Sequence, residues 1–545
     1  MSCDVSAVIN AARRAVQAGK LEIAGDLADQ VLAKAPDNLD AIEIQALVAL
    51  GRHDHWQAEK SLRKAISLAP QRRWPYADLA RLLVELGRSA DAEAVARSAI
   101  TADERNPDAH AMLGTILASL ELWTDAAAHF ESAISIAGRH PQLLTGLGQA
   151  QLRQGRPNEA CAILQEATVA APSELEPAAY LAEAHEWLGN FDSAMRELDR
   201  AEAIARSQGG DVDLQRSALL SRMGKTEQAL ALLDSRPDLS GAARLQRGRL
   251  FERIGKYAEA WEDWIAGKAQ LAERTGRRYA AAEVHNQAKR MEALVADHQS
   301  APQRSDVPQP IFIIGFPRAG TTLTEQIIAS HSEIRSGGEL PFGAELFELV
   351  RSDASPSPRT LRDRYLSRAG EQGLLAPGAA YFTDKMPDNS FWLPLLRIAF
   401  PRSPVVLLNR HPLDVLTSVM AHDMTHGFNC GYRLRDAASH FALTDELLAR
   451  FDCAGVGPTH ELRYEQLIAD QHGETERLME AIGLDLEPLQ LSFHSRQVVS
   501  PTPSYAQVRE PLNDRSIGRW SNFSLQLETI IPVVAAAIER GGYSA

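Results

Sequence analysis

The sequence lacks three features that would place it in other classes of protein. It has four cysteines, Cys3, Cys161, Cys430 and Cys453, with no C-x-x-C pair, so we expect a reducing compartment and no disulfide framework. No apolar run approaches the roughly 18–20 residues that a membrane helix needs, and the N-terminus has no signal-peptide pattern. The formal net charge of −14 argues against a nucleic-acid binder. We therefore expect a cytoplasmic protein without a membrane span.

The first half of the chain repeats a short helical pattern. Glycines that close one helix and open a turn recur about every 34 residues, at Gly51, Gly87, Gly155, Gly189, Gly224 and Gly255. This pattern resembles the tetratricopeptide repeat (TPR), with about seven or eight repeats between residues 4 and 271. Such repeats stack into a superhelix whose groove binds peptides or proteins, so we expect a peptide or protein partner or acceptor there. A run of unrelated helical hairpins fits the spacing poorly.

The composition changes once along the 545 residues, which are too many for a single core. A helix over residues 279–296 would cap the repeats, and residues 299–310 are polar and proline-rich, as in a linker. Apolar runs of the β type then alternate with helical patterns, which indicates a parallel α/β sheet. We therefore predict a repeat domain over residues 1–298, a linker over 299–310 and a second domain over 311–545.

Residues 311–323 carry the strongest signal for a binding site. The run Ile-Phe-Ile-Ile is typical of a buried strand, and it breaks at Gly315 and Pro317. A loop of small residues then leads into a helix. The helix N-terminus presents backbone N–H groups and the positive end of the helix dipole, and Arg318 adds a forked cation. The expected ligand carries a phosphate or sulfate group.

The loop differs from that of nucleotide hydrolases. Its order is Pro317, Arg318, Ala319, Gly320, Thr321, Thr322, without the lysine that precedes the magnesium-binding hydroxyl in the Walker pattern. The arginine argues against an ATP-dependent P-loop kinase, which stays open as an alternative. An ordinary strand-to-helix turn with a surface arginine is the other alternative.

A second strand end is predicted to meet the first. Residues 405–408 are typical of a buried strand, Arg410 follows directly, and Ser418 lies in the second turn of the next helix. Ligands of open parallel sheets bind at the carboxyl ends of the strands. We therefore expect Arg318 and Arg410 to line one site, with Arg410 and Ser418 gripping one phosphate.

Together these motifs resemble the sulfotransferases that use 3′-phosphoadenosine 5′-phosphosulfate (PAPS), most closely the tyrosylprotein sulfotransferase branch. The resemblance covers about residues 311–523, in the order of the family's motifs. It implies that residues 317–322 form the 5′-phosphosulfate loop and that Arg410 and Ser418 bind the 3′-phosphate. The expected fold is an all-α TPR superhelix followed by an α/β, P-loop-like sulfotransferase domain with a central parallel sheet.

Further positions follow from the same resemblance. Glu339 matches the catalytic base, and Lys385 matches the lysine that contacts the bridging oxygen. Tyr464 matches a residue beside the nucleotide, and Ser504 and Arg519 match residues that close over it. The family usually has lysine at the place of Arg519, a change that keeps the charge and alters the donor geometry. The implied cofactor is PAPS, with adenosine 3′,5′-bisphosphate (PAP) as product, and no metal is expected.

Sulfuryl transfer needs these residue types on chemical grounds as well. A hydroxyl attacks sulfur while negative charge grows on the bridging oxygen of the leaving phosphate. Glu339 is expected to take the hydroxyl proton, and Lys385 and Arg318 to stabilise the developing charge. The predicted acceptor hydroxyl belongs to a peptide or protein in the TPR groove, with tyrosine a candidate, or to a glycan or small metabolite. The non-enzymatic alternative is a TPR scaffold with an inactive nucleotide-binding domain.

Overall fold

The computed structural model describes residues 5–86, 88–120, 122–208, 210–276, 278–296, 307–352, 356–424, 428–495 and 511–544. The chain divides into two compact units, Met1–Asp211 and Val212–Ala545. The first unit consists of helical repeats. The second contains further repeats and a sheet, so part of the repeat region belongs to the same compact unit as the sheet.

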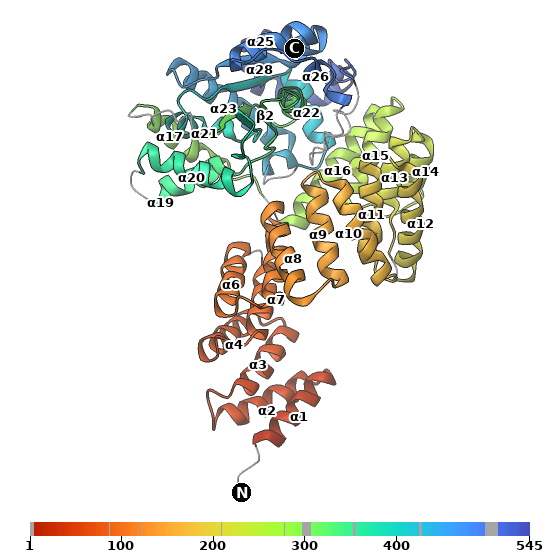
Figure 1. Ribbon diagram of the computed structural model, residues 1–545. Coiled ribbons are helices and arrows are strands. Elements are labelled where there is room, and N and C mark those ends of the chain that lie inside the picture. The colour runs from red at the N-terminus through yellow and green to blue at the C-terminus, as the bar shows by residue number, and fades with distance from the viewer. Residues whose placement is uncertain are drawn as a thin grey trace. The chain divides into compact units, whose positions relative to one another are not determined.

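The first unit is a stack of paired helices (Figure 1). Its helices are α1 (Val5–Gln17), α2 (Leu21–Leu32), α3 (Leu39–Gly51), α4 (His55–Leu68), α5 (Trp74–Glu85), α6 (Ser89–Ala102), α7 (Pro107–Ser119), α8 (Trp123–Ala137), α9 (Pro141–Arg153), α10 (Pro157–Ala170), α11 (Leu175–Trp187) and α12 (Phe191–Ser207). Asn38 and Asp54 each accept a hydrogen bond from a backbone N–H in the first turn of the next helix. Gly155 and Gly189 have φ of 75° and 78°, which side-chain-bearing residues rarely adopt. Gly155 and Gly189 are therefore turn residues between helices, as Gly224 and Gly255 are with φ of 77° and 78°, whereas Gly51 is the last residue of α3 and Gly87 lies outside the described residues.

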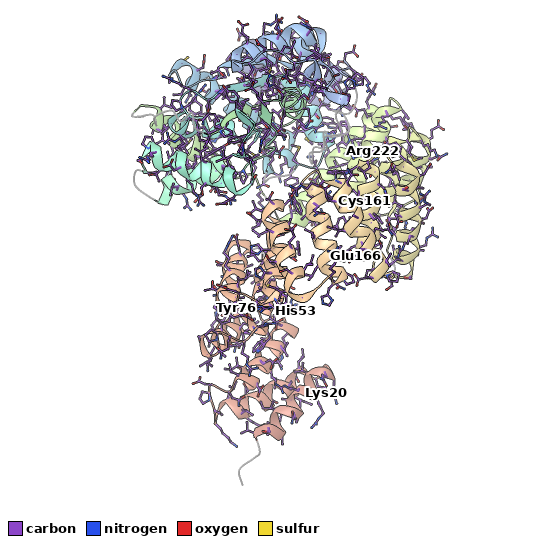
Figure 2. The ribbon with its side chains drawn as sticks, in the orientation of Figure 1. Lys20, His53, Tyr76, Cys161, Glu166 and Arg222 are labelled. Carbon is purple, nitrogen blue, oxygen red and sulfur yellow. The ribbon has the colours of Figure 1, made fainter. Side chains whose placement is uncertain are left out.

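Small residues let the helices of a pair approach closely. A Cβ atom at Gly148 in α9 would lie 2.5 Å from Cγ of Leu164 in α10, so only glycine fits there. Alanines such as Ala58 and Ala160 are fully buried between helices. Figure 2 shows the side chains along this stack, with Lys20, Tyr76 and Glu166 at separate levels of it. The alanine-rich helices of the sequence thus serve close packing.

The second unit begins with more helices and continues into the sheet. These elements are α13 (Asp213–Arg222), α14 (Thr226–Asp234), α15 (Gly241–Arg253), α16 (Tyr257–Thr275), α17 (Ala281–Ala296), β1 (Gln309–Ile314), α18 (Thr321–Ile328), β2 (Ile334–Arg335), α19 (Phe342–Ser352), α20 (Pro358–Glu371), β3 (Tyr381–Asp384), α21 (Asn389–Ala399), β4 (Val405–Asn409), α22 (Pro412–Ala421), η1 (Asn429–Tyr432), α23 (Leu434–Cys453) and β5 (His460–Arg463). After β5 come α24 (Tyr464–Ala469), α25 (Gln471–Ile482), α26 (Pro488–Leu491), η2 (Phe493–Ser495), η4 (Arg519–Phe523), α27 (Ser524–Leu527), η5 (Glu528–Ile530) and α28 (Ile531–Arg540).

The sheet is parallel, with strand order β2-β3-β1-β4-β5. Side chains of β1 alternate between its two faces, since Ile311 and Ile313 belong to one core cluster and Phe312 and Ile314 to another. Both clusters include residues of the surrounding helices, as a parallel sheet requires. Ile314 pairs with Leu407, so β1 and β4 end side by side. The predicted fold class, helical repeats followed by an α/β domain with a central parallel sheet, is confirmed.

Helices α15 and α16 share a core with the sheet. Trp264 of α16 is fully buried, and its ring centroid lies 5.0 Å from that of Phe523 in η4. Tyr257 and Trp261 of the same helix also contact the Phe523 ring, at 5.5 Å and 5.6 Å. The compact unit that holds the sheet begins at Val212, within the repeats. The predicted domain boundaries at residues 298 and 310 therefore stay a prediction.

The C-terminal helical segment is unusually apolar. Within the described ranges, Arg519–Arg540 is long and apolar enough, by length and composition only, to cross a membrane. From the sequence no membrane span is expected, because the apolar run over residues 530–538 is far shorter than a membrane helix. Helices packed inside a domain pass the same test, and Leu527 and Val534 lie in the core cluster on one face of the sheet. The absence of a membrane span therefore stays a prediction.

Candidate active site

The loop between β1 and α18 contains three residues with positive φ: Gly315 (148°), Arg318 (75°) and Gly320 (116°). A Cβ atom at Gly315 would lie 2.7 Å from the carbonyl oxygen of Leu408, and one at Gly320 would lie 2.8 Å from the ring of Tyr464. Glycine is therefore required at both places where the loop passes its neighbours. Arg318 adopts the left-handed conformation despite its side chain, at a cost of roughly 1–2 kcal/mol, and such strain is typical of functional sites.

The same loop places Arg318 against α22. Nε of Arg318 donates to Oγ of Ser418 over 3.0 Å, as the predicted shared site requires. Thr321 and Thr322 form the buried first turn of α18, whose N-terminus carries the positive end of its dipole. Pro317 and Ala319 lie in the loop between these groups, and Ala319 is buried. The predicted phosphosulfate loop thus lies directly beside the predicted 3′-phosphate residue.

Arg410 follows β4 and reaches across to the loop. Its Nη1 donates to the carbonyl oxygen of Arg318 over 3.2 Å, and its Nη2 donates to the carbonyl oxygen of Ser516. The Arg410 guanidinium lies 4.5 Å from the ring centroid of Tyr464, the first residue of α24. Its Nε is buried and has no hydrogen-bond partner among the described residues. The two arginines predicted to share a site are therefore in contact, and the buried Nε of Arg410 can still donate to a ligand.

Positive charge accumulates at this point. Burial, and then the neighbouring guanidinium groups of Arg410, Arg519 and Arg249, lower the pKa of Arg318 to about 9. Like charges gathered in a partly desolvated place repel one another unless an anion lies among them. The orphaned Nε of Arg410 and the surrounding cations therefore fit a ligand with several negative charges, as PAPS has.

Glu339 and Lys385 form an ion pair near the end of the neighbouring strands. Nζ of Lys385 donates to a carboxylate oxygen of Glu339, and the side chains of Lys385 and Glu339 are only 1% and 15% exposed. Lys385 follows β3, and its backbone N–H donates to the carbonyl oxygen of Gly338 over 2.8 Å. Because β3 pairs with β1, this ion pair and the arginine contact lie on loops at the same edge of the sheet. A carboxylate and a cation thus lie together, and their roles as base and charge stabiliser stay predictions.

Sequence reasoning missed Glu325, which is buried in α18. Its Oε1 accepts hydrogen bonds from Oγ of Ser336 (3.1 Å), the backbone N–H of Gly338 (2.8 Å) and Oγ1 of Thr383 (2.8 Å). One carboxylate therefore ties the helix after the anion loop to the segments that carry Glu339 and Lys385. Its sequence signal is that of any carboxylate near a helix start, so no local motif marks it.

Asp384, directly before Lys385, was also missed. Its side chain is fully buried, accepts a hydrogen bond from the hydroxyl of Tyr365 over 2.7 Å, and accepts another from the backbone N–H of Met386 over 3.2 Å. Burial raises the pKa of the Asp384 carboxyl to about 7, although these hydrogen bonds oppose the rise. Asp384 thus fixes the turn that presents Lys385.

Arg519 lies at the site, and the carboxylate with which it pairs was not predicted from the sequence. It forms an ion pair with Glu252 of α15, and its guanidinium lies 5.5 Å from a ring centroid of Trp264. Asp414 in α22 positions this segment by accepting hydrogen bonds from the backbone N–H groups of Gly518 and Trp520, both over 2.8 Å. Its predicted companion, Ser504, lies outside the described residues.

The fold and the site together define a helical-repeat protein whose α/β domain gathers arginines at the ends of parallel strands. Residues 310–488 match the sulfotransferase family, and residues 77–142 and 117–176 match tetratricopeptide repeats. Segments of this chain thus match both tetratricopeptide repeats and the sulfotransferase family, which confirms the resemblance inferred from the motifs at that level.

Parts of this chain are similar to three curated relatives. An uncharacterized protein of Aquifex aeolicus (strain VF5) is 28% identical over 259 residues, 43% of this chain and 33% of its own length. A Caenorhabditis briggsae protein named "Putative protein-tyrosine sulfotransferase" is 27% identical, over 40% of this chain and 82% of its own. The nodulation protein NoeE of Sinorhizobium fredii (strain NBRC 101917 / NGR234) is 26% identical, over 33% of this chain and 51% of its own. The chain thus spans only a third of the Aquifex relative and half of NoeE.

Proposed function

We propose that the protein transfers the sulfuryl group of PAPS to a hydroxyl acceptor. The observation that carries the proposal is the contact between Arg410 and the backbone of Arg318, with Ser418 bonded to the Arg318 side chain. Two separate strand ends thereby bring guanidinium groups to one place, as a nucleotide with phosphates at two positions would need. The match of residues 310–488 to the sulfotransferase family supports the same conclusion.

In the proposed reaction, the acceptor oxygen forms a bond to sulfur while the bond between sulfur and the bridging phosphate oxygen breaks. Glu339 takes the proton of the attacking hydroxyl, and Lys385 stabilises the negative charge that grows on the bridging oxygen. Arg318 and the N-terminus of α18 hold the 5′-phosphosulfate. The products are a sulfate ester and PAP.

The proposed acceptor is a peptide or protein, with tyrosine as the first candidate hydroxyl. Tetratricopeptide repeats commonly bind peptides and proteins, and here they precede the sulfotransferase-family domain in one chain. The name of the Caenorhabditis briggsae relative supports tyrosine, over the 40% of this chain that it matches.

Two measurements with the full chain test the proposal. Calorimetric titration is expected to show tight binding of PAP without added metal and weaker binding of ATP with magnesium. Incubation with sulfur-labelled PAPS and a peptide library is expected to label peptides that contain tyrosine. Tighter binding of ATP with magnesium would favour a kinase instead, and PAP binding without any transfer of label would favour the scaffold alternative.

A further inference from the structure

Arg249, a residue of the helical repeats, reaches the sulfotransferase site. It lies in α15, and its Nη1 donates to the carbonyl oxygen of Ala421 over 2.9 Å. Ala421 ends α22, one turn after Ser418. A cation at a helix C-terminus is stabilising in itself, because it faces the last carbonyl groups. This stabilising role needs no ligand. Whether Arg249 can also bind a ligand depends on the groups that surround its guanidinium.

These surroundings form a closed ring of contacts. Arg249 contacts Ala421 at the end of α22, and Ser418 of the same helix contacts Arg318. Arg318 contacts Arg410, which in turn contacts Ser516 on the segment before Arg519. Arg519 pairs with Glu252, which lies in α15 together with Arg249 and closes the ring. Residues from α15, the anion loop, the end of β4, α22 and the segment before η4 therefore meet around one place. We call Arg249, Arg318, Arg410 and Arg519 the arginine ring.

Two members of the arginine ring, Arg249 and Arg410, have no carboxylate partner among the described residues. Arg519, in contrast, pairs with Glu252. Burial, and then the charges of Arg253 and Arg519, lower the pKa of Arg249 to about 10. Cations such as Arg249 and Arg410 repel one another where they are partly desolvated, so their charges favour an anionic ligand at this place.

Arg249 also has donors to spare. A guanidinium has five N–H donors, and Arg249 uses Nη1 on Ala421 and Nη2 on the side-chain oxygen of Gln246. Arg249 keeps some exposure to solvent, in contrast to Lys268 of α16, which is buried and donates to the carbonyl oxygen of His422. Lys268 therefore serves the contact between helices, while Arg249 can still bind a ligand.

We propose that Arg249 binds the 3′-phosphate of the donor together with Arg410 and Ser418, so that the repeats supply part of the nucleotide site. The inference rests on the proposed function. We assign Arg249 to the 3′-phosphate because Arg249 contacts the C-terminal end of α22, and α22 carries Ser418, the residue expected to hold that phosphate. The repeats would then complete the sulfotransferase site as well as present a partner.

The test compares two ligands that differ only in the 3′-phosphate, PAP and adenosine 5′-monophosphate, on the full chain. Arg249→Gln keeps a donor for Ala421 and removes the charge. It is expected to weaken PAP binding by about 10- to 100-fold, the loss of one charged hydrogen-bonding partner, and to leave binding of the monophosphate unchanged. Arg249→Lys is expected to restore part of the PAP affinity.

Arg253→Gln is the matched control, because Arg253 lies one turn further along α15 and donates to Ser221 instead. It is expected to leave the affinity for both ligands near wild type. Equal losses for both ligands in Arg249→Gln, or no loss for PAP, would overturn the role of Arg249. A wild-type protein that binds PAP no better than the monophosphate would instead overturn the proposed function.

Discussion

Lys385 and Glu339 form an ion pair that is almost shielded from solvent, although 46 residues separate them in the chain. In the proposed sulfuryl transfer, the pair brings together two groups with different tasks. The carboxylate can accept the proton of the acceptor hydroxyl, and the ammonium group can face the leaving oxygen. The side chain of Glu325 and the buried Asp384 hold the segments on which the two groups lie.

Replacing the proton acceptor should stop transfer without disturbing the nucleotide. We expect Glu339→Gln to lower kcat by ~10²–10⁴-fold, because the amide cannot take the hydroxyl proton, and to leave the affinity for PAP near that of the wild type. Labelled transfer and calorimetry measure the two effects. Glu348→Gln, at an exposed position of α19, is the control for loss of one carboxylate. Near-normal turnover in Glu339→Gln would remove Glu339 as the base.

Removing Arg410 should weaken the nucleotide site directly. We expect Arg410→Ala to bind PAP about 10- to 100-fold more weakly, since a charged donor beside Arg318 is lost. Arg402→Ala is the matched control, because Arg402 is exposed and precedes the same strand at its other end. Calorimetry at two salt concentrations checks the result, as binding to a cationic site weakens with added salt. Unchanged PAP affinity in Arg410→Ala would reject the phosphate clamp.

Glu325 should act by positioning other residues. Glu325→Ala leaves three donors without their acceptor, among them the buried hydroxyl of Thr383, which we expect to cost about 1–3 kcal/mol of the free energy of unfolding. Glu325→Gln keeps an acceptor oxygen, so we expect it to lower the free energy of unfolding and kcat less than Glu325→Ala does. Thermal unfolding and turnover measure both quantities. A kcat that stays at the wild-type value in Glu325→Ala would show that Glu325 does not position Glu339.

The stability of the protein should carry a contribution from Asp384 that falls as pH rises. Its carboxyl keeps its proton in the folded state up to about pH 7, whereas an unfolded chain releases it near pH 4. Between these values the folded state binds more protons, so the free energy of unfolding decreases with pH by up to ~1.4 kcal/mol per pH unit. Asp384→Asn removes this contribution and retains an acceptor for Tyr365.

The Tm of wild type and of Asp384→Asn, measured by calorimetry at several pH values between the two pKa values, shows whether stability falls as pH rises. The Tm of Asp384→Asn relative to wild type is expected to rise steadily from about pH 4 to about pH 7, over the interval between the two pKa values. A constant difference would mean that Asp384 titrates alike in the folded and unfolded chain.

Local patterns were enough to predict the main elements and the arginine contact. The strand predicted over residues 405–408 is β4, Val405–Asn409, and the capping helix predicted over residues 279–296 is α17, Ala281–Ala296. Arg318 and Arg410 could be placed together because the carboxyl ends of parallel strands meet at one edge of a sheet. Each of these inferences used only periodicity, a turn residue or a rule of topology.

The supporting residues could not be predicted in that way. Glu325 and Asp384 act through contacts with segments 11 to 58 residues distant, and neither sits in a pattern that differs from an ordinary helix or strand end. Glu252 pairs with Arg519 across 267 residues, from a region where the sequence showed only repeats. Such pairings follow from tertiary packing, which a single sequence does not reveal.

The burial of Trp264 against Phe523 has a consequence for how this architecture can vary over evolution. A solenoid gains or loses units most easily where a unit touches only its neighbours, and α15 and α16 do not meet that condition. We therefore expect descendants of the same ancestor to differ in the number of units before α13 and to retain the last pair. A homologue that keeps every side chain of the proposed active site but lacks α15 and α16 would contradict this expectation.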